Sequence, residues 1–501
     1  MSIKKLAGQT MWYGLPSIAT RFIGYILNFS LIFIYQAVDT ADLTQIYAIF
    51  PFLNILFTYG VETSYFRFMQ QKDGAKLFNT LNISLFISTI LFCLALWGLQ
   101  GPLVTFTAME EHPEYLQWMV GILFFDTLST LAFAKLRHEE RPRRYAFIKI
   151  LGIIVNVAIV FWYIGICPRI AASHPDSLFL LGYRESVGIG YYLVGNFIGS
   201  ILTFVLLLPS FKGFKFQFDR ALWKEVMVYA MPLIIVGLGG MINDMLSRLV
   251  FQHVVDLPVR EAKHQLGIFA ANYRLAVLIT IFIQMFRLAA EPFFFNQSKQ
   301  KDAPETYAKV MNYFVMACCF MFLGIGLFLD VFKEIMSLKY KDYGEGIQIV
   351  PILAMGGVFL GIYYNLSIWY KLTNKNWYGA GITLAGAVIT ILLNILWIPK
   401  FGYVGSAWAT FCCYLFMMIS SYFLGQKYYP TPYSVRKILG YLLLIMVLTV
   451  ISMTANTMLP SLWMKLLLSF GLMGGFLLFA MRSERALFAS LPVVGKWIKE
   501  D

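Results

Sequence analysis

Four arginines lie within long apolar stretches of the sequence, where a charged side chain is costly. They are Arg21, Arg248, Arg274 and Arg287. An arginine at the centre of a membrane helix costs about 2.5–3.5 kcal/mol on insertion scales. We therefore expect these side chains to face the interior of a helix bundle or a water-filled cavity, with partners, rather than lipid.

Acidic residues near the arginines divide them into two groups. Asp244 precedes Arg248 by four residues, and Glu291 follows Arg287 by four. This spacing lets each pair meet on one helix face, which favours internal ion pairing over ligand binding. The other two arginines have no acid three or four residues away. A cation without a local partner inside a membrane suits an anionic ligand such as a pyrophosphate.

Further polar residues interrupt other apolar stretches. Tyr25 and Asn28 follow Arg21 at helical spacing along one face, so Asn28 joins the four arginines as a candidate substrate-binding residue. Glu62 and Asp126 lie in two more apolar stretches. Together with Asp244 and Glu291, these two residues are candidates for counter-charges or for binding a coupling ion.

The composition indicates a chain that lies mostly in lipid. Hydrophobic residues make up 59% of the 501 residues and charged residues 13%, against about 45–50% and 25% in soluble domains. The mean hydropathy is +0.68. These values exclude a disordered chain, a nucleic-acid-binding domain and a typical soluble enzyme, despite the net charge of +13.

Fourteen apolar runs are long enough to span a membrane as helices, which takes about 20 residues. We predict an all-α polytopic membrane protein with spans near residues 8–35, 43–66, 77–98, 115–134, 145–167, 187–208, 224–252, 266–295, 306–332, 346–370, 377–398, 402–425, 436–457 and 462–481.

The loops predict the orientation. With the amino terminus inside, the inner segments hold roughly three times as many Lys and Arg as the outer loops, as expected of cytoplasmic segments. The basic loop 135–144 is then inside and the acidic loop 109–115 outside. An even number of spans places both termini in the cytoplasm.

The first and seventh spans show a weak internal repeat. Tyr13 aligns with Tyr229 and Pro16 with Pro232, and the two pairs are separated by the same number of residues along the chain. A six-plus-six duplication would give two halves in the same orientation, an arrangement common among transporters. A proline removes a backbone hydrogen bond and can kink a helix, so we predict Pro16 and Pro232 as hinges.

Catalytic and metal-binding patterns are not evident. The sequence has neither a GxxxxGK[ST] phosphate loop nor an HExxH motif, and none of its five histidines lies in mid-span. We expect no catalytic residues, no metal site and no cofactor. Energy for transport would come from an ion gradient, the membrane potential or the substrate's own gradient.

Several segments resemble one family of transporters. LLNILWIPKFGYVGSAWAT (392–410) resembles the Asn, Ile-Pro and GxxGxA signature of polysaccharide flippases in the multidrug/oligosaccharidyl-lipid/polysaccharide exporter superfamily. The segments 59–68, 271–295 and 361–381 are similar to matching parts of lipopolysaccharide and capsule flippases. The resemblance implies two pseudo-symmetric six-helix lobes around a central cavity, with two further helices at the carboxyl end.

This resemblance also implies a division of the chain. We expect an amino-terminal lobe, a cytoplasmic interfacial connector, a second lobe, the last two spans and a cytoplasmic tail, with bounds at 1–210, 211–223, 224–426, 427–481 and 482–501.

The function implied is flipping of an undecaprenyl-diphosphate-linked oligosaccharide, an O-antigen or capsule repeat unit, across a bacterial plasma membrane by alternating access. Its partners would be the lipid-linked oligosaccharide and membrane lipids, with polymerase and chain-length machinery as candidates and no nucleic acid. An ion-coupled multidrug exporter and a lipid II flippase of the same superfamily are the alternatives. A membrane-embedded glycan polymerase or acyltransferase is disfavoured because no large outer loop is present.

Overall fold

The computed structural model describes residues 19–485 apart from positions 21, 70, 299 and 374, and leaves out the side chains of 288, 289, 291, 292 and 296. All regular elements in these described residues are helical, and thirteen helices among them are long and apolar enough to cross a membrane. A shorter apolar helix, Phe22–Phe33, lies in the described part of the first predicted span. The predicted all-α polytopic fold is confirmed.

The chain divides into two compact units, Met1–Gly267 and Ile268–Asp501. The helices of the first unit are η1 (Leu31–Phe33), α2 (Ala37–Thr58), α3 (Val61–Phe68), α4 (Gly74–Gly98), α5 (Gln100–Thr107), α6 (Glu114–His138), α7 (Pro142–Val160), η2 (Phe161–Ile166), α8 (Cys167–Ser173), η3 (Leu178–Leu180), η4 (Glu185–Gly190), α9 (Tyr191–Leu207), η5 (Leu208–Phe211) and α10 (Arg220–Val254).

Helix α11 (Val259–Gln297) begins before the division of the chain and supplies the first helix of the second unit. The other helices of that unit are α12 (Ala303–Gly326), α13 (Leu329–Met336), η6 (Lys341–Ile349), α14 (Val350–Leu366), α15 (Ile368–Leu372), α16 (Asn376–Phe401), α17 (Tyr403–Tyr428), α18 (Val435–Met458) and α19 (Leu462–Ser483).

Some helix starts carry side chains that cap the free backbone N–H groups. The Asp73 side chain accepts from the N–H groups of Ala75 and Lys76 at the start of α4, at 2.9 and 3.4 Å. Asp219 accepts from Leu222 N–H at 2.9 Å at the start of α10. Such caps satisfy donors that have no partner within the first turn of the helix.

The second predicted span is interrupted near its carboxyl-terminal end. Tyr59 and Gly60 both have left-handed backbone angles, with φ of 31° and 70°, and they separate α2 from α3. A Cβ at position 60 would lie 3.4 Å from the Leu233 side chain of α10. Glycine at position 60 therefore tolerates both the positive φ and the close approach of the Leu233 side chain at this break.

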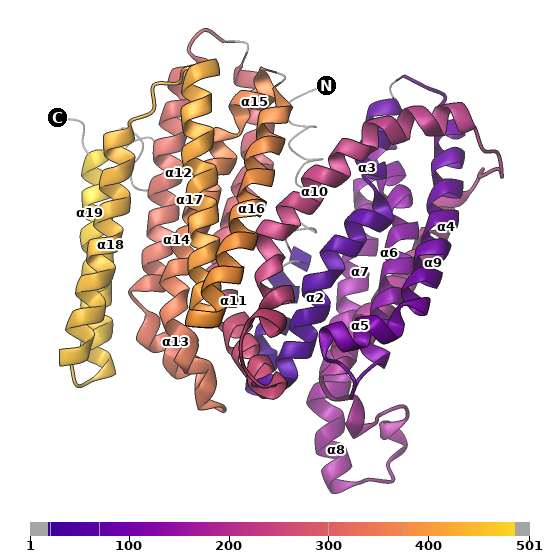
Figure 1. Cartoon of the computed structure of the whole chain (residues 1–501), viewed down its shortest axis with the longest axis horizontal. Coiled ribbons are helices and arrows are strands. Elements are labelled where there is room, and N and C mark those ends of the chain that lie inside the picture. The colour runs from indigo at the N-terminus through magenta and orange to yellow at the C-terminus, as the bar shows by residue number, and fades with distance from the viewer. Residues whose placement is uncertain (1–18, 21, 70, 299, 374, 486–501) are drawn as a thin grey trace. The chain divides into compact units, whose positions relative to one another are not determined.

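The break in the second span faces the part of α10 that contains Pro232. This proline lies inside a helix that continues from Arg220 to Val254, and the helix curves along its length (Figure 1). The hinge role of Pro232 remains a prediction. The matching Pro16 lies outside the described residues.

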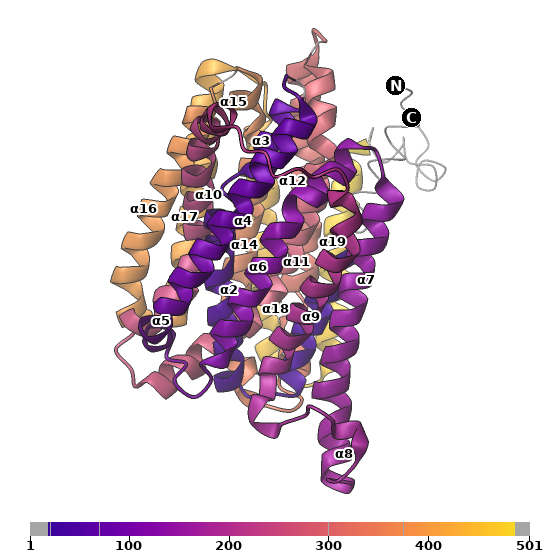
Figure 2. The ribbon, with the colours of Figure 1, turned by 90° about the vertical axis from the view of Figure 1, so that its right-hand side faces the viewer.

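Helix α6 is the centre of the first unit, where it packs against α2, α4 and α9. Helix α7 packs on α9 through small residues: a Cβ at Gly199 would lie 3.1 Å from the carbonyl oxygen of Gly152. Small residues at such a contact let two membrane helices approach closely. From α7 the chain continues through η2 into α8, which extends beyond the neighbouring helices of this unit (Figures 1 and 2).

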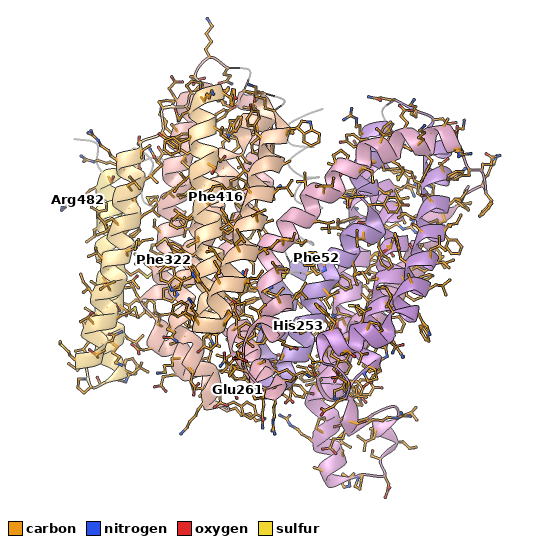
Figure 3. The ribbon with its side chains drawn as sticks, viewed as in Figure 1. Phe52, His253, Glu261, Phe322, Phe416 and Arg482 are labelled. Carbon is orange, nitrogen blue, oxygen red and sulfur yellow. The ribbon has the colours of Figure 1, made fainter. Side chains whose placement is uncertain are left out.

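In the second unit, α14 packs against α12 and α17, and α17 packs against α16. Helices α18 and α19 lie side by side against α12 at the edge of this unit (Figure 1). Phe322 of α12 is buried, while Arg482 extends from the end of α19 (Figure 3). The bounds given above for the lobes, the connector and the tail remain predictions.

Candidate functional site

The predicted arginines fall in different parts of the chain. Arg248 lies on α10 in the first unit, and Arg274 and Arg287 lie on α11 in the second. Arg21 lies outside the described residues. The two units are therefore considered separately below.

Arg248 is nine-tenths buried and belongs to the contact between α10 and α2. Its guanidinium donates to the sulfur of Met245, one turn earlier on the same helix. Gln45 of α2 donates from Nε2 to the Arg248 carbonyl oxygen at 2.9 Å. This bond from an amide side chain ties α2 to α10 at the level of the arginine.

Asn28 and Asp244 are half-buried residues of the same unit. Asn28 lies on the helix Phe22–Phe33, and Asp244 lies one turn before Arg248 on α10. Each takes part in at least one polar or aromatic contact. Their roles in substrate binding and charge balance remain predictions.

Asp126 lies on α6 within a predominantly apolar part of the first unit. The Ser200 side chain is a hydrogen-bond partner of its carboxylate, and Lys149 is the cation whose charge acts on it. Lys149 lies with its Nζ 4.3 Å from the centre of the Phe133 ring. Asp126 thus has a polar and a charged neighbour from two other helices, α9 and α7.

A chain of polar side chains lies on the other side of Asp126. Tyr47 of α2 is close enough for the two groups to interact electrostatically, and its hydroxyl accepts from the Asn196 amide of α9. Asn156 of α7 donates to the Asn196 oxygen at 2.6 Å. The Asn156 oxygen is buried and has no hydrogen-bond partner among the described residues. This cluster joins four helices through groups that need partners in an apolar environment.

Glu62 has its counter-charge on another helix. It forms an ion pair with Arg137 at the end of α6, and that guanidinium also lies 4.9 Å from the centre of the Phe66 ring. Eleven residues of α6, or about 16 Å of helix, separate Arg137 from Asp126. The structure therefore does not bring Glu62 and Asp126 together.

One buried ion pair was not predicted from the sequence. Lys263 Nζ of α11 lies 2.7 Å from the Asp42 carboxylate of α2, and the two side chains are only 12% and 11% exposed. Asp42 and Lys263 lie just before the predicted spans 43–66 and 266–295. Nothing in the local sequence links two residues so far apart.

In the second unit, Arg274 is half-buried on α11, two residues after the fully buried Asn272. The Asn272 amide donates to the carbonyl oxygens of Ile268, at 2.9 Å, and Tyr343, at 2.8 Å. This second bond holds α11 against η6. Arg274 itself has a partner, so it is not an isolated cation.

Arg287 lines a small pocket of about 20 Å³ in the same unit, formed by α11, α12, α14 and α15. Its guanidinium lies 4.7 Å from the centre of the Tyr364 ring. Lys371 and Asn365 line the same pocket. The predicted partner Glu291 has no described side chain, so this pairing remains a prediction.

A search for metal ligands finds no group of three or more His, Cys, Asp or Glu side chains within the described part of the chain. The charged groups described above are single residues or pairs. Their chemistry is that of ion pairing, hydrogen bonding and binding of charged ligands.

Comparison with solved structures defines the class of protein. The structure is similar to "Lipid II flippase MurJ, inward closed conformation" with a TM-score of 0.71 and 14% identity, covering 95% of this chain and 99% of that one. It is also similar to an inward-facing multidrug resistance MATE family transporter of the MOP superfamily, with a TM-score of 0.62 and 13% identity over 80% and 93% of the two chains.

A third similar structure is the Vibrio cholerae MATE transporter VcmN in the bent form, with a TM-score of 0.54, 12% identity, and 87% and 99% of the two chains covered. At these identities the likeness concerns the fold. The protein is a multi-pass membrane protein with the fold of MOP superfamily transporters.

The sequence itself identifies the family. The profile of the family described as "Polysaccharide biosynthesis protein" matches residues 6–298, more than half of the chain. A search of curated proteins finds no match. The chain belongs to the polysaccharide biosynthesis protein family, and its fold is that of MOP superfamily transporters. The family resemblance predicted from the sequence is confirmed.

Proposed function

We propose that the chain flips an undecaprenyl-diphosphate-linked oligosaccharide, an O-antigen or capsule repeat unit, from the inner to the outer leaflet of a bacterial plasma membrane by alternating access. The observation that supports this most directly is the family match over residues 6–298. The intramembrane arginines add to it, because a cation inside an apolar bundle suits a phosphorylated substrate.

The arginines are proposed to contact the diphosphate. Arg274 and Arg21 are the first candidates, and Arg248 and Arg287 the second, with Asn28 as a polar contact for the sugar or the phosphate. Arg248 is already packed between α10 and α2. We therefore expect its replacement to affect stability as well as transport.

Asp126 is the acidic residue best placed to couple transport to an ion. The described residues supply it with both a hydroxyl neighbour and a cation from other helices. Glu62 has Arg137 as a counter-charge, so we propose a structural role for it. Asp244 and Glu291 are proposed as counter-charges of Arg248 and Arg287.

Complementation of a flippase-deficient strain tests this function. The wild-type chain should restore the surface glycan, and Arg274→Ala should abolish this while its level in the membrane stays normal. Arg482→Ala is a matched control, because Arg482 is exposed at the end of α19 (Figure 3) and its loss should leave rescue intact. Failure of the wild-type chain to restore any surface glycan would overturn the proposal.

The fold likeness to a lipid II flippase supplies a second candidate. It predicts that the wild-type chain sustains growth of cells depleted of their own lipid II flippase. A multidrug exporter would instead raise drug resistance without restoring either glycan. Running the three tests in parallel separates the three substrates.

A further inference from the structure

Exposed apolar residues identify the lipid-facing side of α7 and its continuation η2. Phe147, Ile154 and Phe161 follow one another at seven-residue intervals, so they lie close to one face of the helix. All three side chains are exposed in the first unit. On a helix that crosses a membrane, an apolar face of this kind packs against lipid tails.

Helices α7 and η2 reach the edge of the hydrocarbon core near Trp162. Pro142 begins α7 at the end that the basic loop 135–144 predicts to be cytoplasmic. Trp162 lies twenty residues later, or about 30 Å along a helix, which is also about the thickness of the hydrocarbon core. Trp162 and Tyr163 are therefore placed at the outer membrane–water interface, where tryptophan and tyrosine are enriched.

The chain returns to this level after α8, although α8 itself extends further out (Figures 1 and 2). The centres of the Trp162 and Phe179 rings lie 6.4 Å apart. The Tyr163 hydroxyl donates to the Leu181 carbonyl oxygen at 3.2 Å. The Ser177 hydroxyl oxygen accepts from Phe179 N–H at 3.3 Å, which caps η3. These contacts hold η3 beside η2 at the level of the interface.

The segment held there presents apolar side chains outward. Leu178, Phe179 and Leu181 are 91%, 67% and 83% exposed. Exposed apolar residues that lie together mark a surface that contacts a partner or a membrane. Because Phe179 contacts Trp162, the residue after Phe161, this patch continues the lipid-facing side of α7 toward the outer surface.

We infer that Leu178, Phe179 and Leu181 form an anchor that inserts into the interfacial region of the outer leaflet. Its partner is phospholipid, whose upper acyl chains would surround the three side chains, as they do the apolar face of an interfacial helix. The anchor holds the segment between α8 and α9 against the membrane. The inference does not depend on which substrate the protein transports.

Fluorescence quenching in the reconstituted full-length protein tests the anchor. A fluorescent amino acid that is excited at longer wavelengths than tryptophan replaces Leu178 or Leu181 in separate preparations. The vesicles contain phosphatidylcholine and phosphatidylglycerol, with or without bromine on the acyl chains. Bromine quenches a fluorophore that touches the chains, whereas iodide quenches one in water. Both labels should be quenched by the brominated chains and protected from iodide.

Position 174 supplies a matched control. Ser173 ends α8 eleven residues after Trp162, or about 16 Å further along a helix, and His174 is exposed. A label in place of His174 should therefore be quenched by iodide and not by the brominated chains. This result would establish that the label does not enter the bilayer by itself.

A charge within the patch should release the anchor. In protein labelled at position 181, Phe179→Asp should lower the ratio of inserted to water-exposed segment about tenfold or more, as expected when one large apolar side chain returns to water. Ser173→Asp adds the same charge outside the patch and should leave the quenching unchanged. Size-exclusion profiles establish that each variant is folded.

Two outcomes would overturn the inference. One is iodide access at both labelled leucine positions without quenching by the brominated chains. The other comes from a photoreactive amino acid in place of Leu178 in living cells. Adducts with phospholipid support the anchor, whereas an adduct with one protein in their place would show that the patch binds a protein partner instead.

Discussion

Loss of the Lys263 ammonium group is expected to destabilise the first unit by about 3 kcal/mol. Its Nζ lies 2.7 Å from the Asp42 carboxylate, and both side chains are nearly buried, at 12% and 11% exposure. Removing one partner of a buried ion pair costs about 3–5 kcal/mol, because the other charge stays buried without compensation. The lower end applies here because some solvent reaches both groups.

The double variant distinguishes pairing from general packing. Lys263→Met and Asp42→Asn should each cost about 3 kcal/mol, while the double variant should cost about 4 kcal/mol, because no unpaired charge remains. The coupling energy between the two sites would then be about 2 kcal/mol, within the usual range for residues in contact.

The measurement is the free energy of unfolding of the detergent-solubilised protein in increasing SDS, followed by tryptophan fluorescence. Lys72→Met is the control within the same unit. Lys72 pairs with Glu225 at 2.9 Å, but those side chains are 38% and 49% exposed, so the loss should be at most about 1 kcal/mol. Additive costs of the two single variants, with coupling below about 0.5 kcal/mol, would refute a stabilising interaction between Asp42 and Lys263.

Three other predictions follow from single contacts. The hydrogen bond from Lys76 keeps the pKa of Asp219 below its ordinary value. In unfolding measurements the wild type should therefore be more stable than Asp219→Asn above pH ~4. This difference in stability should fade on further acidification. Asp126→Asn should reach the membrane normally yet lose most surface-glycan rescue; full rescue would exclude ion coupling through this carboxylate. In Gly195→Ala the new Cβ would lie 2.6 Å from the Asn156 side-chain oxygen, so thermal unfolding should show a loss of about 1–3 kcal/mol.

The spans could be predicted from the sequence because hydropathy over about 20 residues is a local property. Each of the thirteen described spans overlaps a predicted run. The interruption at Tyr59 and Gly60 was not predicted, because two left-handed residues scarcely change the hydropathy of a window. The Tyr-Gly pair within an apolar run was the available signal, since glycine tolerates positive φ.

The candidate sites could be predicted only in part. Helical spacing brings residues three or four apart together, so it predicts that Asp244 pairs with Arg248. It provides no information on Asp42 with Lys263, or Glu62 with Arg137, because the partners lie on helices distant in the sequence.

Asn365 was not predicted, because its place in the sequence does not show that its side-chain nitrogen would be buried without a hydrogen-bond partner among the described residues. The available signal was an amide side chain deep within the apolar run 346–370.

The surroundings of the cations indicate which of them are structural. Lys263 has a carboxylate at 2.7 Å, so its charge is neutralised within the fold and its donors are directed at that partner. Arg287 is an exposed side chain that contacts the face of the Tyr364 ring, a contact worth about 0.5–1 kcal/mol at an exposed site. We therefore expect substitutions at Lys263 to act strongly on stability, and substitutions at Arg287 to change stability by about 1 kcal/mol or less.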